Sequence, residues 1–451
     1  MNAAFPDTIV AIATPRGRGG IGVLRLSGPQ ARAVAERIAG ALPEPRHFAL
    51  RRFRDAEGNT IDHGLVLRFA APHSFTGEDV IELHAHGGPV LLDCLLQAAC
   101  AAGARIARPG EFSERAFLNG RLDLTQAEAI ADLIDAESRG ALRAAARALE
   151  GEFSKRVNEL VEGLIALRAD LEAALDFADE DVPWIDGERL ATRIAGLRQR
   201  LGQLQAQATQ GRRLREGLTV AIAGRPNVGK STLLNQLAGA EAAIVSPMAG
   251  TTRDLLREHV LLDGMPLTLI DTAGLRETAE PIEREGVRRA RAALEKADLV
   301  LFVADDVVGL TAEDETLLAS LPGATPTLIV YNKCDLSGRP PAWLGARDGR
   351  DALRLCAASG AGLERLREAL KRHAGFSGAA EGAFSARRRH LEALGRAATM
   401  LHRAQEIAAG ANPELVAEEL RLAQQAFDEI TGRFTSEDLL GRIFAGFCIG
   451  K

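Results

Sequence analysis

The stretch LTVAIAGRPNVGKST at residues 218–232 decides the fold of the middle of the chain. An apolar run leads into a glycine-rich loop with the spacing G-x-x-x-x-G-K-S, and a helical pattern follows. In that setting backbone N–H groups surround phosphates at a helix N-terminus, Lys230 brings charge to the β- and γ-phosphates, and the Ser231 hydroxyl is a ligand for Mg²⁺. The stretch therefore predicts a nucleotide-binding P-loop between a strand and a helix.

Two motifs downstream predict the metal-binding side of this nucleotide site. DTAG at residues 271–274 ends an apolar strand, which brings the Asp271 carboxylate near Mg²⁺ and the Gly274 amide near the γ-phosphate. GTTRD lies between the P-loop and this strand and offers Thr252 as the switch threonine on Mg²⁺. The motifs occur in the order that a GTPase requires.

The motif NKCD at residues 332–335 predicts the base. It ends another apolar strand, and the Asp335 carboxylate there accepts two hydrogen bonds from guanine. Adenine has no donors in that arrangement and would leave the carboxylate unpaired, which gives strong discrimination. CAA at residues 356–358 is a weak match to the Ser-Ala-Lys loop that also contacts guanine. Together these elements predict that the nucleotide is GTP.

Residue Leu275 indicates that hydrolysis differs from that of Ras-type enzymes, which orient the attacking water with a Gln at this position. Leucine has no polar group for this task, so another group must position the water. The alternative is that the nearby charged residues only cover a solvated switch. These residues are Arg276, Glu277, Glu280, Glu283, Arg284 and Glu285.

Three kinds of sequence pattern follow one another along the chain. Glycine and proline punctuate short apolar runs in the first part, which predicts an α+β domain over residues 1–118. Apolar residues then recur at helical spacing, for example Leu160, Leu164, Leu167 and Leu171, before strands alternate with helices and helical texture returns. We therefore predict a multidomain chain in which an α/β P-loop GTPase domain (216–378) is inserted between two halves (119–215 and 379–451) of an all-α helical domain.

Composition restricts the class of protein. The chain has 451 residues, 46% of them apolar, a formal charge of -6 and five cysteines. These values are those of a globular protein without a disulfide framework, and they argue against a general nucleic-acid coat. The sequence shows no secretory signal and no run of about 20 apolar residues. We expect a soluble, reduced, cytoplasmic protein with no membrane segment.

Two smaller motifs have alternative interpretations. Glu82, His84 and His86 alternate along one strand and so share a face, where they could form part of a metal site. The chain ends in Cys448-Ile449-Gly450-Lys451. Gly450 and Lys451 fit a prenylation box poorly, and a buried apolar thiol is the simpler alternative.

The blocks together resemble the MnmE (TrmE) family of bacterial tRNA-modification GTPases. The similar segments are DTIVAIATPRGRGGIGVLRLSG, SFTGEDVIELHAHGGP and RPGEFSERAFLNGRLDLTQAEAIADLI near the start. GRPNVGKSTLLN, AIVSPMAGTTRD, DTAGLRET and NKCD follow in the middle, and CIGK ends the chain. The resemblance covers essentially the whole chain and agrees with the predicted fold.

For the nucleotide site, the resemblance implies a K⁺ ion in the place of an arginine finger, held by Asn227, Ser246, Met248 and Thr251. Ser231 and Thr252 would hold Mg²⁺, and Glu283 would position the attacking water, although Pro281 and Ile282 just before it depart from the family pattern. The implied GTP-binding residues are Asn227, Val228, Gly229, Lys230, Ser231, Thr232, Ser246, Pro247, Met248, Ala249, Gly250, Thr251, Thr252, Asp271, Thr272, Ala273, Gly274, Asn332, Lys333 and Asp335.

For the N-terminal domain, the resemblance implies a site for a tetrahydrofolate derivative, 5-formyl- or methylene-tetrahydrofolate, contacted by Arg25, Glu82, Arg121 and Lys451. Glu82 would accept two hydrogen bonds from the pterin, as Asp335 does from guanine. Arg121 stands where relatives often carry Lys, and a solvated arginine is its alternative role. Cys448 would lie near the one-carbon unit as a nucleophile or acid–base group.

The activity implied is that of a GTP-hydrolysing subunit that adds an aminomethyl or carboxymethylaminomethyl group at carbon 5 of the tRNA wobble uridine. The implied partners are tRNA, a second copy of the chain in a homodimer, and the FAD-binding MnmG (GidA) protein in a heterotetramer or larger complex. A basic helix face with Arg387–Arg389, Arg396 and Arg403 is either an RNA contact or merely solvated.

Two other classes of function remain open on the sequence. A regulatory or ribosome-assembly GTPase that acts by binding alone would leave two features unexplained: the segments of the N-terminal domain that resemble a folate site, and the terminal CIGK. A free-standing folate aminomethyltransferase with a vestigial GTPase domain would not need the intact Lys230, Ser231, Thr252 and Asp271.

Overall fold

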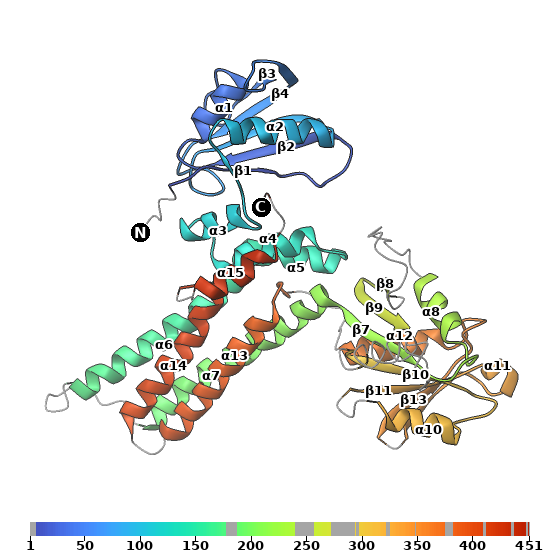
Figure 1. Cartoon of the computed structure of the whole chain (residues 1–451). Coiled ribbons are helices and arrows are strands. Elements are labelled where there is room, and N and C mark those ends of the chain that lie inside the picture. Colours follow the sequence, from blue (N-terminus) through green and yellow to red (C-terminus); the bar gives the residue numbers. More distant parts are fainter. Residues whose placement is uncertain are drawn as a thin grey trace. The chain divides into compact units, whose positions relative to one another are not determined.

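A computed structural model places most of the chain in two units. The residues it describes are 6–176, 187–239, 257–271, 294, 297–321, 325–347, 349–374, 382–408, 412–433, 437–447 and 450. One unit comprises residues 1–134, 147–202 and 392–451, and the other comprises 135–146 and 203–391. Figure 1 shows the elements of both units, coloured along the sequence.

The N-terminal part of the first unit is a mixed sheet in the order β3-β4-β5-β2-β1-β6. Neighbours pair antiparallel except β1 with β6, which run parallel. The strands are β1 (Ile9–Ile12), β2 (Gly19–Ser27), β3 (Phe48–Arg54), β4 (Thr60–Phe69), β5 (Val80–Gly87) and β6 (Arg105–Ile106). The predicted α+β domain is confirmed.

Helices α1 (Ala31–Ala39) and α2 (Pro89–Ala101) pack on one face of this sheet (Figure 1). Because side chains alternate along a strand, Ile81 and Leu83 point into this buried core while Glu82 and His84 point to the other face. The register pairs Glu82 with Arg25 of β2, so the polar face carries a carboxylate beside a guanidinium.

The C-terminal helix of the chain packs beside early helices of the same unit. These are α3 (Glu111–Leu118), α4 (Leu124–Ile134) and α15 (Glu437–Ala445). Their shared core includes Leu124, Phe444 and Phe447. Gly110 has φ +67°, and a Cβ at this position would lie 2.6 Å from the Phe444 carbonyl oxygen. Glycine therefore permits the close approach that brings the chain end to the N-terminal part.

Long helices form the rest of the all-α part, with bounds α5 (Arg139–Leu149), α6 (Glu152–Asp176), α7 (Gly187–Glu216), α13 (Arg388–Ala408) and α14 (Pro413–Thr431). Leu160, Leu164, Leu167 and Leu171 of α6 are all buried, as their spacing predicts. Polar pairs join neighbours at the surface, such as Arg193 of α7 with Asp170 of α6 at 2.6 Å. The predicted helical bundle is confirmed.

The second unit contains a sheet in the order β12-β13-β11-β10-β7-β9-β8. Its strands are β7 (Leu218–Ala223), β8 (Arg257–Leu262), β9 (Met265–Asp271), β10 (Leu299–Asp305), β11 (Thr327–Asn332), β12 (Ala342–Arg347) and β13 (Arg350–Arg354). The inner pairs are parallel, and β8 and β12 add antiparallel edges. The sequence predicted the parallel strands and missed the two edge strands.

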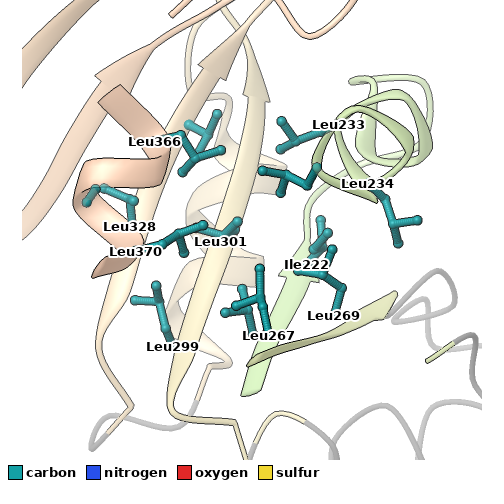
Figure 2. Packing of buried hydrophobic residues seen from close by; sticks show 14 of the residues in the cluster. Ile222, Leu233, Leu234, Leu267, Leu269, Leu299, Leu301, Leu328, Leu366 and Leu370 are labelled. Atoms are coloured by element: carbon teal, nitrogen blue, oxygen red, sulfur yellow. The ribbon is translucent and has the colours of Figure 1, made fainter. Parts of the chain in front are cut away.

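Helices cover both faces of this sheet. Leucines of α8 (Lys230–Gly239) and α12 (Leu363–Ala374) pack against strand residues such as Ile222 and Leu301 (Figure 2). On the other face, α10 (Ala312–Ala319) buries Leu318 against Phe302. Each fully buried leucine contributes about 2 kcal/mol of apolar transfer free energy. The doubly wound α/β fold predicted from the alternating strands is confirmed.

Among the described residues, every helix is too short or too polar to cross a membrane. The exact bounds of the four predicted segments stay predictions.

Candidate functional site

The P-loop joins β7 to α8 through backbone conformations that favour glycine and, less strongly, asparagine. Gly224 has φ +136° and Gly229 has φ +99°. A Cβ on Gly224 would collide with the Val303 carbonyl oxygen, and one on Gly229 would collide with the side-chain amide of Asn332. Asn227 at the tip of the loop also has a positive φ, of 63°. The glycines of the motif are therefore required by the close approach of neighbouring strands.

Lys230 folds back over the loop that precedes it. Its Nζ donates to the carbonyl oxygens of Gly224 and Arg225, each at 2.8 Å. A contact with α10 holds the loop in place, because Arg225 Nε donates to Asp314 Oδ1 at 2.9 Å and the Asp314 side chain is fully buried. The ammonium is thus held within the loop, and Ser231 follows it as an exposed residue of the first turn of α8.

Asn332 connects the P-loop to both segments expected to recognise guanine. Its buried side chain donates from Nδ2 to the Val228 carbonyl at 2.8 Å and accepts from the Ala357 N–H at 2.8 Å. Asp335 lies exposed in the first turn of the short helix α11 (Cys334–Ser337). The structure therefore brings NKCD, the CAA loop and the P-loop together, and Asp335 is exposed beside them. Its role in binding the base stays a prediction.

Part of the predicted nucleotide site lies outside the described residues. Asp271 ends β9, beside Ile222 of β7, as its motif predicts, but its side chain is not described. The remaining predicted residues that lie outside are Ser246, Pro247, Met248, Ala249, Gly250, Thr251, Thr252, Thr272, Ala273, Gly274, Glu283, Cys448 and Lys451. Their roles stay predictions.

On the polar face of the N-terminal sheet, Arg25 and Glu82 form an ion pair. Glu82 Oε1 lies 2.9 Å from both Nε and Nη2 of Arg25, and Oε2 lies 3.1 Å from His84 Nε2. The Arg25 guanidinium carbon also lies 5.8 Å from the ring centroids of Phe75 and Phe112. The side chains of Glu82 and Arg25 are 16% and 24% exposed, so solvent reaches this pair only partly.

The end of the chain lies against the same pair. The Gly450 carbonyl oxygen accepts from Arg25 Nη1 at 3.5 Å. Gly450 has φ +98°, and a Cβ there would lie 2.5 Å from the Ile12 carbonyl of β1. The structure thus brings Arg25, Glu82 and the residue before Lys451 together.

Arg121 lies on a neighbouring segment. It is exposed, and its side chain runs beside Gly77, where a Cβ would lie 3.3 Å from Arg121 Cγ. Asn119 on the same segment donates to the Thr76 carbonyl at 2.8 Å. The contacts of Arg121 are thus with this loop, and they leave both of its predicted roles open.

A buried ionic network supports this face, and the sequence did not predict it. Arg115 is wholly buried, and its guanidinium lies 2.8 Å from Asp7 Oδ1, 3.2 Å from Glu78 Oε1 and 3.1 Å from Glu111 Oε1. Burial alone would raise the pKa of Glu111, but hydrogen bonds from Arg105, from the Arg108 backbone and from Arg115 lower it to about 2. The signal available in the sequence was the pairing of Glu111 and Arg115 one helical turn apart.

The metal interpretation of Glu82, His84 and His86 receives no support. His84 pairs with Glu82, whereas His86 Nδ1 lies 3.0 Å from Asp62 Oδ1 and its side chain is 76% exposed. Across the part of the chain that the structure describes, no group of three or more His, Cys, Asp or Glu side chains is placed to hold a metal ion.

Comparisons with known proteins cover the whole chain. Residues 8–121 match the family model described as GTP-binding protein TrmE N-terminus, and residues 124–448 match the model of the MnmE helical domain. A protein of Stutzerimonas stutzeri (strain A1501) named tRNA modification GTPase MnmE is 53% identical over 450 residues, which are 99% of each chain. The chain belongs to the MnmE (TrmE) family. A Methylococcus capsulatus (strain ATCC 33009 / NCIMB 11132 / Bath) protein of the same name is 52% identical over 451 residues, 100% of each chain.

Membership of the MnmE family confirms the resemblance, the multidomain fold and the prediction of a GTPase. The MnmE helical-domain match begins before the second unit and ends after it, which agrees with an inserted α/β domain. Family membership does not assign roles to individual residues of this MnmE chain, and those roles rest on the contacts of the described residues and on prediction.

Proposed function

We propose that this chain is the GTP-hydrolysing subunit of a complex that modifies the wobble uridine of tRNA at carbon 5. The product would carry an aminomethyl or carboxymethylaminomethyl group, and methylene-tetrahydrofolate would donate the carbon. The observation that carries this proposal is the meeting of Arg25, Glu82 and the Gly450 carbonyl on one face of the N-terminal sheet. A GTPase that acted only by binding would have no use for this arrangement.

The chemistry of these residues fits a folate. A pterin ring presents N–H and amino donors to a carboxylate, and Glu82 is a partly exposed carboxylate whose Oε2 has one hydrogen-bond partner among the described residues, His84, and so keeps acceptor capacity. Arg25 and His84 orient it by binding one oxygen each. Lys451 follows Gly450 directly and would contact the bound folate. The folate supplies a one-carbon unit, and the Cys448 thiol would stand beside it as a nucleophile or acid–base group.

The nucleotide site fits hard cations. Asn227 and Ser231 are exposed residues that carry oxygen donors on the loop and on the first turn of α8, and oxygen ligands suit Mg²⁺ and K⁺. Ser231 with Thr252 would hold Mg²⁺, and Asn227 with Ser246, Met248 and Thr251 would hold K⁺. These ions supply positive charge at the phosphates, and Glu283 would orient the attacking water.

The basic helix face is poorly suited to be the main RNA contact. Arg396 is in an ion pair with Glu429 of α14, which favours a solvated surface over a site kept for phosphates. We therefore infer that tRNA binding depends largely on the FAD-binding MnmG (GidA) partner. A homodimer in the cytoplasm is part of the same proposal.

Equilibrium binding of 5-formyl-tetrahydrofolate to the full-length chain tests the folate half. Glu82→Gln keeps the shape of the side chain but removes its charge, so we expect affinity to fall by at least about tenfold. Asp62→Asn is the matched control, because the Asp62 carboxylate binds the His86 ring and the N–H groups of His63 and His86, toward the end of β5 rather than at Glu82. Equal folate affinity in wild type and Glu82→Gln, with both variants folded, would contradict the proposal.

A further inference from the structure

Two adjacent carboxylates, Asp305 and Asp306, lie at the carboxyl end of β10, between the strands that carry the P-loop and NKCD. They belong to none of the predicted GTP-binding motifs. In parallel sheets this edge is where ligands bind. Each carboxylate accepts hydrogen bonds from a segment that is expected to contact the guanine base.

Asp305 holds the lysine of NKCD. Its Oδ2 accepts from Lys333 Nζ at 2.8 Å, and its Oδ1 accepts from the Val307 N–H at 2.9 Å. Burial acts to raise the pKa of Asp305, but these two hydrogen bonds bring it below its ordinary value, so the carboxylate is ionised at neutral pH. Lys333 has φ +67°, a conformation unusual for lysine, and the ion pair helps to hold it.

Asp306 is 3% exposed and connects both guanine segments. Its Oδ1 accepts from Arg354 Nε at 2.8 Å, and its Oδ2 accepts from the Ser337 hydroxyl. Its backbone N–H donates to the Asn332 carbonyl at 2.7 Å. Ser337 ends α11, the helix that presents Asp335, and Arg354 ends β13, just before the CAA loop. One buried carboxylate therefore joins the two segments.

We propose that Asp305 and Asp306 are positioning residues for guanine recognition, which hold NKCD and the CAA loop at the separation that a guanine base requires. Hydrogen bonds weaken steeply when distance or angle departs from the optimum. Asp335 must present two oxygens to two donors at once, so a small shift of α11 weakens both bonds. Without Asp306, the half-buried Arg354 would also lose its charged partner.

Asp306→Asn in the full-length chain tests the proposal. Binding of fluorescent N-methylanthraniloyl-GDP should weaken by about tenfold. The GTP concentration that gives half-maximal hydrolysis should rise by a similar factor, because substrate binding is weakened. The kcat at saturating GTP should stay within about twofold, because the P-loop and its Lys230 are untouched. Preference for GTP over ATP should shrink, which a general loss of structure would not cause selectively.

Asp298→Asn is the matched control. Asp298 precedes the same strand at its opposite end, where its carboxylate accepts from the Thr219 N–H at 2.9 Å. It should leave nucleotide affinity and base preference unchanged. If Asp306→Asn fails to fold, Ser337→Ala keeps both carboxylates and removes the bond between Asp306 and α11, together with the local Ser337 contacts to the Cys334 carbonyl and the Arg339 N–H. It should weaken GDP binding by about threefold.

Unchanged GDP affinity in Asp306→Asn would overturn the proposal, or in Ser337→Ala if the first variant does not fold. So would equal losses for GTP and ATP, or a fall in kcat without a change in the half-maximal concentration. In those cases the two carboxylates would only stabilise the domain.

Discussion

The buried carboxylate of Glu111 gives a quantitative prediction. Its side chain is 1% exposed, and its pKa falls from 4.5 to about 2. At about 1.4 kcal/mol per tenfold change in proton affinity, this amounts to about 3 kcal/mol of stability at neutral pH. A carboxyl with a lowered folded-state pKa stabilises above its unfolded pKa of 4.5 and loses this contribution as pH falls through about 2. At pH 3 about 1 kcal/mol should remain.

The perturbation is Glu111→Gln, which keeps the size of the side chain and removes its charge. Native-state hydrogen exchange in the full-length chain should show protection in α3 and β1 reduced by on the order of a hundredfold at pH 7. At pH 3 the difference from wild type should shrink to about tenfold. Peptides from β10 in the other unit serve as the internal reference.

Glu114→Gln is the control on the same helix. Burial raises the pKa of Glu114, so its ionised form is disfavoured in the fold and loss of its charge should cost no stability at pH 7. Equal losses in the two variants, or a Glu111→Gln deficit that does not change between pH 7 and pH 3, would refute the electrostatic reasoning.

Three predictions concern the nucleotide site. GTP hydrolysis should be faster in KCl than in NaCl, and Asn227→Ala should abolish the difference. Equal hydrolysis rates of the wild type in both salts would contradict the proposed K⁺ site. Lys230→Met should weaken GTP binding by at least about a hundredfold, measured by isothermal titration calorimetry, because it removes the charge held in the loop. Asp335→Asn should reverse base preference from GTP to XTP in competition binding, since an amide can donate to the xanthine 2-oxo group; retained GTP preference would place the base elsewhere.

Contiguous motifs were predictable because the residues that define each one lie within a few positions of one another in the sequence. The P-loop glycines, the strand that precedes NKCD and the apolar spacing of α6 all follow from local rules. The β8 edge strand was missed although its turn was visible, since Asp263 and Gly264 form an Asp-Gly hairpin with φ +49° and +83°.

Contacts between distant segments were not predictable. Arg115 meets Asp7 and Glu78 across 108 and 37 residues, and no local pattern encodes such partners. Asp306 likewise meets Arg354 across 48 residues. Only the fold shows which loops it connects.

The most direct test of the central claim is nucleoside mass spectrometry of bulk tRNA from a host that lacks this chain, with its native MnmG partner present. Wild type should restore the modified wobble uridine, and Glu82→Gln should not, although it still hydrolyses GTP. Full restoration by a Glu82→Gln variant that no longer binds folate would contradict the account, because the carbon would then come from chemistry outside this chain.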